Sequence, residues 1–216
     1  QLHNGLFHFM NSDIQYIPSL FKDIQTGADL SGWSIPPANY FFPDAPAFAV
    51  CLQLFEAPLN AQVCGLFLFS VNMAALIIFL RVVRGSFVDA PYALTAAAIL
   101  LISLPLGLLP GAFFSLVAPT FHSSAIAGLF FFLALLASGD IRPIPRAILL
   151  PLVVFLWGAS DSLFLGLAAG AFVPYILLQL RSGTLSRLDL AIAALCIVAA
   201  VLSRKSMNWV PMHVVR

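Results

Sequence analysis

The feature that most restricts the fold of this chain is an uncharged run at residues 60–80, NAQVCGLFLFSVNMAALIIFL. A helix of about 20 apolar residues crosses ~30 Å of hydrocarbon and satisfies its backbone hydrogen bonds internally. The rest of the chain has the same character, because 61% of its 216 residues are hydrophobic and only 9% are charged. A soluble domain has about 25% charged residues. The sequence therefore predicts an all-α, polytopic membrane helical bundle.

Further apolar segments bring the expected number of spans to about six. The segment 90–117 contains three prolines, which should kink or break its outer half. Residues 147–180 would extend about 51 Å as one helix at 1.5 Å per residue, too long for one crossing, so we expect a break at GASD, 158–161. The shorter segments fit equally well as tilted, buried or re-entrant helices. The expected spans are 60–80, 90–117, 123–137, 147–157, 162–180 and about 188–202.

The basic residues indicate the orientation of these spans. Three alternate loops contain two arginines each, namely Arg81 with Arg84, Arg142 with Arg146, and Arg181 with Arg187. By the positive-inside rule these loops are cytoplasmic. The bundle at 60–203 then presents to the other face an extracytoplasmic loop at 1–59, the turns at His122 and Asp161, and a tail at 204–216. Any chemistry is therefore expected on the extracytoplasmic face.

The segment HFMNSDIQYIPSLFKDIQTG, residues 8–27, predicts an amphipathic helix within the extracytoplasmic loop. Ser12 followed by Gln15 fits a capping box, which places the helix start at Ser12. Pro18 should restrict the helix to two short turns or bend it. Its apolar stripe is typical of a helix lying in the membrane interface and consists of Ile14, Ile17, Phe21 and Ile24.

The next segment, LSGWSIPPANYFFPDAPAF at residues 30–48, predicts an ordered but irregular loop. It contains four prolines, and residues before proline are driven to extended conformations. Trp33 and Tyr40 favour the level of the lipid headgroups. We expect this loop to lie against the membrane surface, where its prolines and aromatic residues would roof a cavity.

Four ionisable residues reach the outer face from four separate segments: Asp13, Asp44, His122 and Asp161. Each has an ordinary structural explanation. Asp13 suits the dipole of a first helical turn, Asp44 and Asp161 suit helix N-caps, and a histidine can end a span at the interface. Ionisable residues at membrane depth are costly and usually line a cavity or site, so their convergence predicts a functional site. The remaining acids of this face, Asp23, Asp29 and Glu56, are expected to be solvated.

Other classes of site find little support. The net charge is +1 without a basic run, and no glycine-rich phosphate loop occurs, so nucleic-acid binding is set aside. The three cysteines, Cys51, Cys64 and Cys196, show no CxxC spacing, which argues against a structural metal. A disulfide between Cys51 and Cys64 stays open. The start at Gln1 suggests a piece of a longer protein that lacks at least one upstream helix.

Several segments together resemble a known family. NSDIQYIPSLFKDI followed by GWSIPPANYFFPDAPAF resembles the first extracytoplasmic loop of bacterial membrane glycosyltransferases of the C-type (GT-C) architecture, relatives of the protein O-mannosyltransferases. FHSSAIAGLFFFLAL and GASDSLFLGLAAGAFVP resemble later segments, so the likeness covers residues 11–174. It implies a multi-pass protein of the bacterial cytoplasmic (inner) membrane, with its active site on the extracytoplasmic side. The sugar donor would be linked to polyprenyl phosphate.

The resemblance also implies roles for individual residues. Asp13 would be the general base that accepts the proton of an acceptor hydroxyl. Asp44 would orient the acceptor or help to hold a divalent cation. The loop has no adjacent acidic pair such as DE or DxD, and no metal ligands are assigned. The expected substrate-binding residues are Asp44, His122, Asp161, Trp33 and Tyr40.

Two other hypotheses compete with a glycosyltransferase. A transporter or flippase of a lipid-linked substrate would place charges at mid-membrane, often on broken helices. A non-catalytic membrane assembly subunit would use Asp13 and Asp44 only to stabilise helix ends. The position of the acidic residues at span ends and in an outer loop favours surface chemistry over transport.

Overall fold

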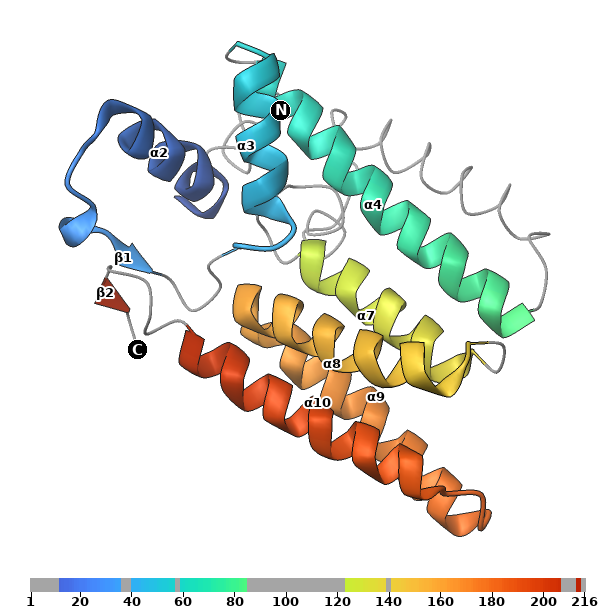
Figure 1. Cartoon of the computed structure of the whole chain (residues 1–216). Helices are drawn as coiled ribbons and strands as arrows, with labels where there is room; N and C mark the ends of the chain where they lie inside the picture. Colours follow the sequence, from blue (N-terminus) through green and yellow to red (C-terminus); the bar gives the residue numbers. More distant parts are fainter. Residues whose placement is uncertain are drawn as a thin grey trace, which may run out of the picture.

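The computed structural model describes residues 12–35, 40–56, 59–84, 123–138, 141–206 and 213–214, and in these the fold is all-α (Figure 1). The helices are α2 (Ser12–Thr26), α3 (Asp44–Leu54), α4 (Leu59–Arg84), α7 (Ser123–Ala137), α8 (Pro143–Ser160), α9 (Ser162–Arg181) and α10 (Arg187–Ser206). A 3-10 turn (Leu30–Gly32) and the short parallel pair β1 (Ser34–Ile35) and β2 (His213–Val214) complete the described elements. The span expected at 90–117 lies outside the described residues.

Three of the described helices are long and apolar enough to cross a membrane. They cover Val63–Arg84 in α4, Pro143–Ser160 in α8 and Ser162–Arg181 in α9. α7 is a shorter apolar helix of 15 residues, with the bounds that the sequence predicts. α10 is not among the three, because acidic and basic residues stand in its first and last turns. The chain is thus a membrane helical bundle.

The predicted break at GASD is confirmed. α8 ends at Ser160 and α9 begins at Ser162, while Asp161 between them has an extended backbone, with φ −146° and ψ 119°. Its Oδ1 accepts a hydrogen bond of 2.9 Å from the Leu163 backbone N–H. Asp161 is therefore the N-cap of α9, which satisfies one of the backbone donors left free at a helix start.

The prediction of a short helix at 147–157 is wrong, because the observed helix is longer. α8 has 18 residues and begins at Pro143, because proline is well suited to the first position of a helix, where no intrahelical N–H bond is needed. Pro151 lies inside α8 without ending it. α2 similarly starts at Ser12 as predicted and continues through Pro18 to Thr26, so this proline does not stop the helix.

A cluster around Trp157 forms the main core. α10 packs along α8, α4 packs along α7, and α7 also contacts α8 and α9. The Trp157 indole N–H donates to the Ser124 carbonyl at 2.6 Å. Gly128 of α7 faces this ring, since a Cβ there would lie 2.3 Å from Trp157 Cδ1. The close approach of α7 and α8 therefore requires a residue without a side chain at Gly128.

A second, smaller cluster joins the N-terminal helices to α4. α2 packs on α3, and α3 packs on α4. The apolar side of α2 is covered by this packing, with Ile17 fully buried, whereas Ile24 at the far end is exposed. Within the described residues before 57, α2 and α3 thus pack together, and the irregular loop expected at 30–48 is wrong at its end, where α3 already begins. The buried members are Ile17, Tyr40, Ala47, Phe48, Cys51, Cys64 and Leu68.

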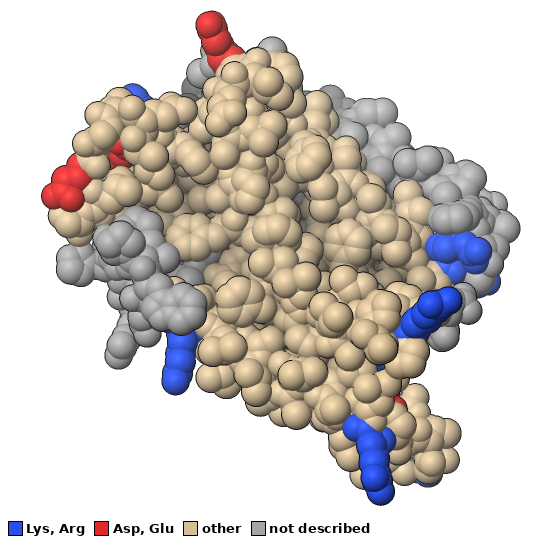
Figure 2. All heavy atoms as spheres, in the orientation of Figure 1, with Lys and Arg blue, Asp and Glu red and all other residues tan. Residues whose placement is uncertain are grey.

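The two ends of the bundle differ in charge. α4 and α9 end, and α8 and α10 begin, at one end, and α2 and α3 lie at the other (Figure 1). Most of the arginines used to orient the spans stand at the first end, where Figure 2 shows a group of basic atoms. We name this the Arg146 end and the opposite one the Asp161 end. Arg204 and Lys205, in the last turn of α10, are at the Asp161 end.

Candidate functional site

The Asp161 end is closed by residues 40–43, which we call the docking loop. The Tyr40 backbone N–H donates to the Ser160 carbonyl at 3.1 Å, and the Phe42 N–H donates to Ser160 Oγ at 3.0 Å. The Phe42 ring meets the Trp157 ring edge-on, with centroids 4.7 Å apart. Segments 118 residues apart are thereby joined at the turn between α8 and α9.

Tyr40, the first residue of the docking loop, is buried in the smaller cluster that joins α2 and α3 to α4. Its φ of 55° lies in the left-handed region, which bulky residues rarely adopt and which costs about 1–3 kcal/mol. The Tyr40 carbonyl accepts from the Ala45 N–H at 3.2 Å, and only 2% of the residue is exposed. The substrate-binding role of Tyr40 stays a prediction.

Two of the predicted acidic residues are completely buried at this end. Asp44 and Asp161 are both 0% exposed. Asp161 caps α9, as described above. Asp44 is the first residue of α3 and Pro43 holds the cap position, so the N-cap predicted at Asp44 falls one residue earlier. A carboxylate in a first turn interacts favourably with the helix dipole, and buried carboxylates need such compensation.

Trp33 lies away from the docking loop. Its indole N–H donates to Asp23 Oδ2 at 2.9 Å, and its ring meets the Tyr16 ring with centroids 5.6 Å apart. The prediction that Asp23 is a solvated surface charge is therefore wrong, because it fastens the chain after α2 back onto that helix. Asp29 is fully exposed, and hydrogen bonds from the Ser31 hydroxyl and N–H lower the pKa of its carboxyl.

Two predicted site residues are not fully described. Asp13 lies in the first turn of α2, as predicted, but its side chain is outside the described part of the structure. His122 lies outside the described residues. Among the predicted residues, the structure thus brings the segments that carry Tyr40, Asp44 and Asp161 to one end of the bundle, and it places Trp33 on α2.

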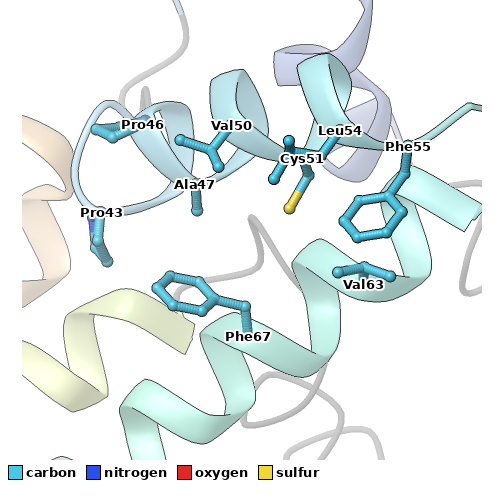
Figure 3. A pocket seen from close by; sticks show the side chains of 9 residues that line it. All are labelled: Pro43, Pro46, Ala47, Val50, Cys51, Leu54, Phe55, Val63 and Phe67. Carbon is cyan, nitrogen blue, oxygen red and sulfur yellow. The ribbon is translucent and has the colours of Figure 1, made fainter.

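An apolar pocket of about 440 Å³ separates α3 from the first turns of α4 (Figure 3). Figure 3 shows side chains of α3 facing Val63 and Phe67 of α4 across it. Its edge residues are open to the surroundings, with Leu54 68% exposed. All nine lining residues are uncharged and almost wholly apolar: Pro43, Pro46, Ala47, Val50, Cys51, Leu54, Phe55, Val63 and Phe67.

The sequence contains the signal for this pocket, although the pocket itself was not predicted. Ala47, Val50, Cys51 and Leu54 recur at intervals of one, three and four, which places them on one side of a helix. The interpretation of residues 30–48 as an irregular loop hid the start of that pattern. Pro43 of the pocket directly precedes Asp44, so the pocket and the buried carboxylate share the start of α3.

Two other residues have roles that the sequence did not reveal. Ser160 supplies both of the acceptors that fasten the docking loop. Arg146, used above only to orient the spans, binds three helices at the opposite end. Its guanidinium donates to the Tyr175 hydroxyl at 2.8 Å and to the Leu136 carbonyl at 3.4 Å, and it lies 4.0 Å from Asp189 Oδ1.

No group of three or more histidine, cysteine, aspartate or glutamate residues that could hold a metal ion occurs among the described residues. A divalent cation at Asp44 therefore stays a prediction.

The chain matches no family model, no curated protein and no solved structure. The relation to the GT-C enzymes therefore stays a prediction.

Proposed function

We propose that this chain is part of a membrane glycosyltransferase that moves a sugar from a polyprenyl-phosphate donor to an acceptor on the extracytoplasmic face of the bacterial inner membrane. The observation that carries the proposal is the start of α3. There a buried carboxylate, Asp44, directly follows Pro43, which lines an apolar pocket at one end of a membrane bundle. A lipid-linked sugar requires both features, because its chain is apolar and its transfer needs a proton acceptor.

The size and the apolar lining of the pocket are consistent with binding of the lipid part of this donor. Its volume of about 440 Å³ falls within the roughly 300–1,000 Å³ of small-molecule sites. Val50, Leu54 and Phe67 at its edge are exposed, and in a membrane bundle such side chains meet lipid. A prenyl chain can therefore enter sideways from the bilayer, with the sugar phosphate directed toward Pro43 and the docking loop.

The proposed reaction forms one bond and breaks one. The acceptor hydroxyl oxygen attacks the anomeric carbon, the bond from that carbon to the phosphate oxygen breaks, and its electron pair leaves with polyprenyl phosphate. A carboxylate takes the hydroxyl proton. Asp44 is the carboxylate that the fold supports, and Asp13 is the one that the resemblance supports. α2 packs on α3, so both residues belong to one pair of helices.

Transfer from a polyprenyl-phosphate sugar by the full-length protein tests this proposal. We expect Asp44→Asn or Asp13→Asn to reduce kcat/KM by about 10²–10⁴-fold, the usual contribution of a general base. The matched control is Glu56→Gln, which neutralises an exposed carboxylate just after α3. Unchanged transfer in both aspartate variants would refute the site assignment.

The transporter hypothesis gains no support from the described spans. Charged residues of α4, α8 and α9 stand only in the first or last turn of each helix. A transport pathway usually places ionisable groups near the bilayer midplane. A carboxylate at the end of the bundle, such as Asp44, suits the transfer of a sugar better.

A non-catalytic assembly subunit is the second candidate, and the geometry of Asp161 favours it. Its carboxylate is engaged as a helix cap, and Asp44 also stands in a first turn. In that case the folded wild-type protein would bind no polyprenyl-phosphate sugar. Donor binding by the purified protein, measured before any transfer assay, separates the two candidates.

A further inference from the structure

Two of the three cysteines belong to the same buried cluster, one on α3 and one on α4. Cys51 and Cys64 are both free thiols in the structure, and the helices that carry them pack together. Cys64 is completely buried, and Cys51 is 6% exposed, in the cluster that also contains Phe48 and Leu68. We propose that Cys51 and Cys64 form a disulfide in the mature protein, which covalently ties α3 to α4.

The placement of the two residues suits this bond. A disulfide needs the two Cβ atoms about 3.5–4.5 Å apart, which is possible only for residues on elements in direct contact. Cys51 and Cys64 meet this requirement as members of one buried cluster on two helices that pack together. α3 and α4 are consecutive helices that pack together, so the bond closes a short loop between neighbouring elements.

The compartment suits it as well. Both cysteines lie toward the Asp161 end, opposite most of the arginines that stand on the cytoplasmic face by the positive-inside rule. Disulfides form and persist outside the cytoplasm, in compartments such as the bacterial periplasm. This inference therefore rests on the orientation within the proposed function, but not on the sugar transfer.

The oxidant is the disulfide of a periplasmic dithiol oxidoreductase. One cysteine thiolate attacks that disulfide and forms a mixed disulfide, and the second thiolate displaces the reduced enzyme. The two thiols lose two protons and two electrons, and the enzyme leaves as a dithiol. Because both thiols are buried in the folded protein, the exchange takes place while α3 is folding onto α4.

The bond would fix the wall of the pocket. Cys51 lines the pocket from α3, and Cys64 stands one residue after Val63, which lines it from α4 (Figure 3). A disulfide here keeps the two helices at a constant separation along that wall. It also holds α3, whose first residue is Asp44, against the membrane bundle.

Counting reactive thiols tests the inference. The full-length protein is expressed in bacterial membranes, acid-quenched, denatured without reductant and labelled with a maleimide, and the labels are counted by mass spectrometry. In a bridged protein, Cys51→Ala frees Cys64 and raises the number of labels by one. Cys64→Ala raises it by one for the same reason. An unpaired cysteine would instead lose one label on mutation. This difference between a gain and a loss does not depend on how many other cysteines the full-length protein contains.

Cys196 provides the matched control. It is buried in α10, in the cluster around Trp157, and no second cysteine belongs to the described part of that cluster. Cys196→Ala should lower the number of labels by one. Reduction before labelling should abolish the gain in the two bridge variants and make all three single variants lose one label.

A loss of one label from Cys51→Ala without reductant overturns the inference. Treatment of the purified protein with the thiol oxidant diamide then locates the error. A bridge formed only with diamide shows that the geometry is suitable but the bond is not native, and no bridge even then shows that the helices are not so placed. A wild type that carries the bridge but transfers no sugar contradicts the proposed function alone.

Discussion

The two ends of the bundle are held together in different ways. At the Asp161 end, backbone N–H groups of the docking loop bind Ser160, which lies 118 residues from Phe42. At the Arg146 end, one guanidinium donates to a carbonyl of α7 and to a hydroxyl of α9, and it lies 4.0 Å from Asp189 of α10. One end is thus closed by a distant segment, and the other by the side chain of one helix residue.

The difference supports the place of the proposed site. The Arg146 end depends on a permanent charge that joins neighbouring helices, an arrangement that serves stability. The Asp161 end depends on a segment that arrives from outside the bundle and brings a carboxylate and the wall of a pocket with it. Binding sites are usually formed by loop residues that a rigid scaffold holds in place. Four predictions test this contrast.

The largest expected effect is at Trp157, because its ring belongs to both the helical core and the contact with Phe42. Trp157→Ala should lower the free energy of unfolding in detergent by about 3–5 kcal/mol, the usual cost of removing a large aromatic side chain from a core. Trp157→Phe keeps a ring but loses the N–H bond to Ser124 and should cost less. Equal losses in the two variants would show that the hydrogen bond, not the packing, holds this end.

Ser160→Ala should affect the Asp161 end only. It removes the acceptor of the Phe42 N–H and should cost about 1–3 kcal/mol, the penalty for leaving a buried donor unpaired. The matched control is Ser162→Ala, since Ser162 is exposed two residues further along. Increased proteolysis within residues 36–43 of the Ser160 variant would identify release of the docking loop. Equal stability of both variants would contradict the importance of this contact.

Tyr175→Phe tests the Arg146 end. It deletes the hydroxyl that accepts from the guanidinium and should cost about 1–2 kcal/mol, as for a polar contact between membrane helices. The comparison is Tyr16→Phe, because the buried Tyr16 hydroxyl has no hydrogen-bond partner among the described residues. That change should leave the free energy of unfolding unchanged or slightly higher. A loss at Tyr16 as large as that at Tyr175 would contradict this assignment.

The smallest effect is confined to alkaline pH. Burial raises the pKa of Tyr16 from 10.0 to about 12. Between these values the folded protein retains a proton that the unfolded chain releases, so stability is fully present below pH 10 and falls as the pH rises toward 12. Tyr16→Phe should remove part of this decline in unfolding measurements. A decline that is identical in the variant would place its origin elsewhere.

The helix boundaries could be predicted from local sequence signals, whereas the segments against which each helix or loop packs could not. GASD carries its own cap, so the break at Asp161 follows from four residues. The start of α8 also has a local signal at Pro143, which the predicted boundary at 147 overlooked. By contrast, nothing near Ser160 indicates that its acceptors serve Phe42, because that pairing depends on how distant segments pack.

The same distinction applies to the candidate site. The alternate arginine pairs placed Asp44 and Asp161 on one face of the bundle before any packing was known. The hydrogen bond from Trp33 to Asp23 was not predictable, because the nine residues between them have to fold back onto α2 for the two side chains to meet. The pocket required the packing of α3 on α4, which no local pattern specifies.

Gly128 fixes how closely α7 and α8 pack beside Trp157. Any side chain at that position would collide with Trp157, so α7 and α8 are interlocked and cannot slide past one another without emptying the core. The docking loop is fastened to the same turn by two hydrogen bonds and one ring contact. The pair α7 and α8 therefore forms a fixed frame, to which the docking loop is attached from outside by these few contacts.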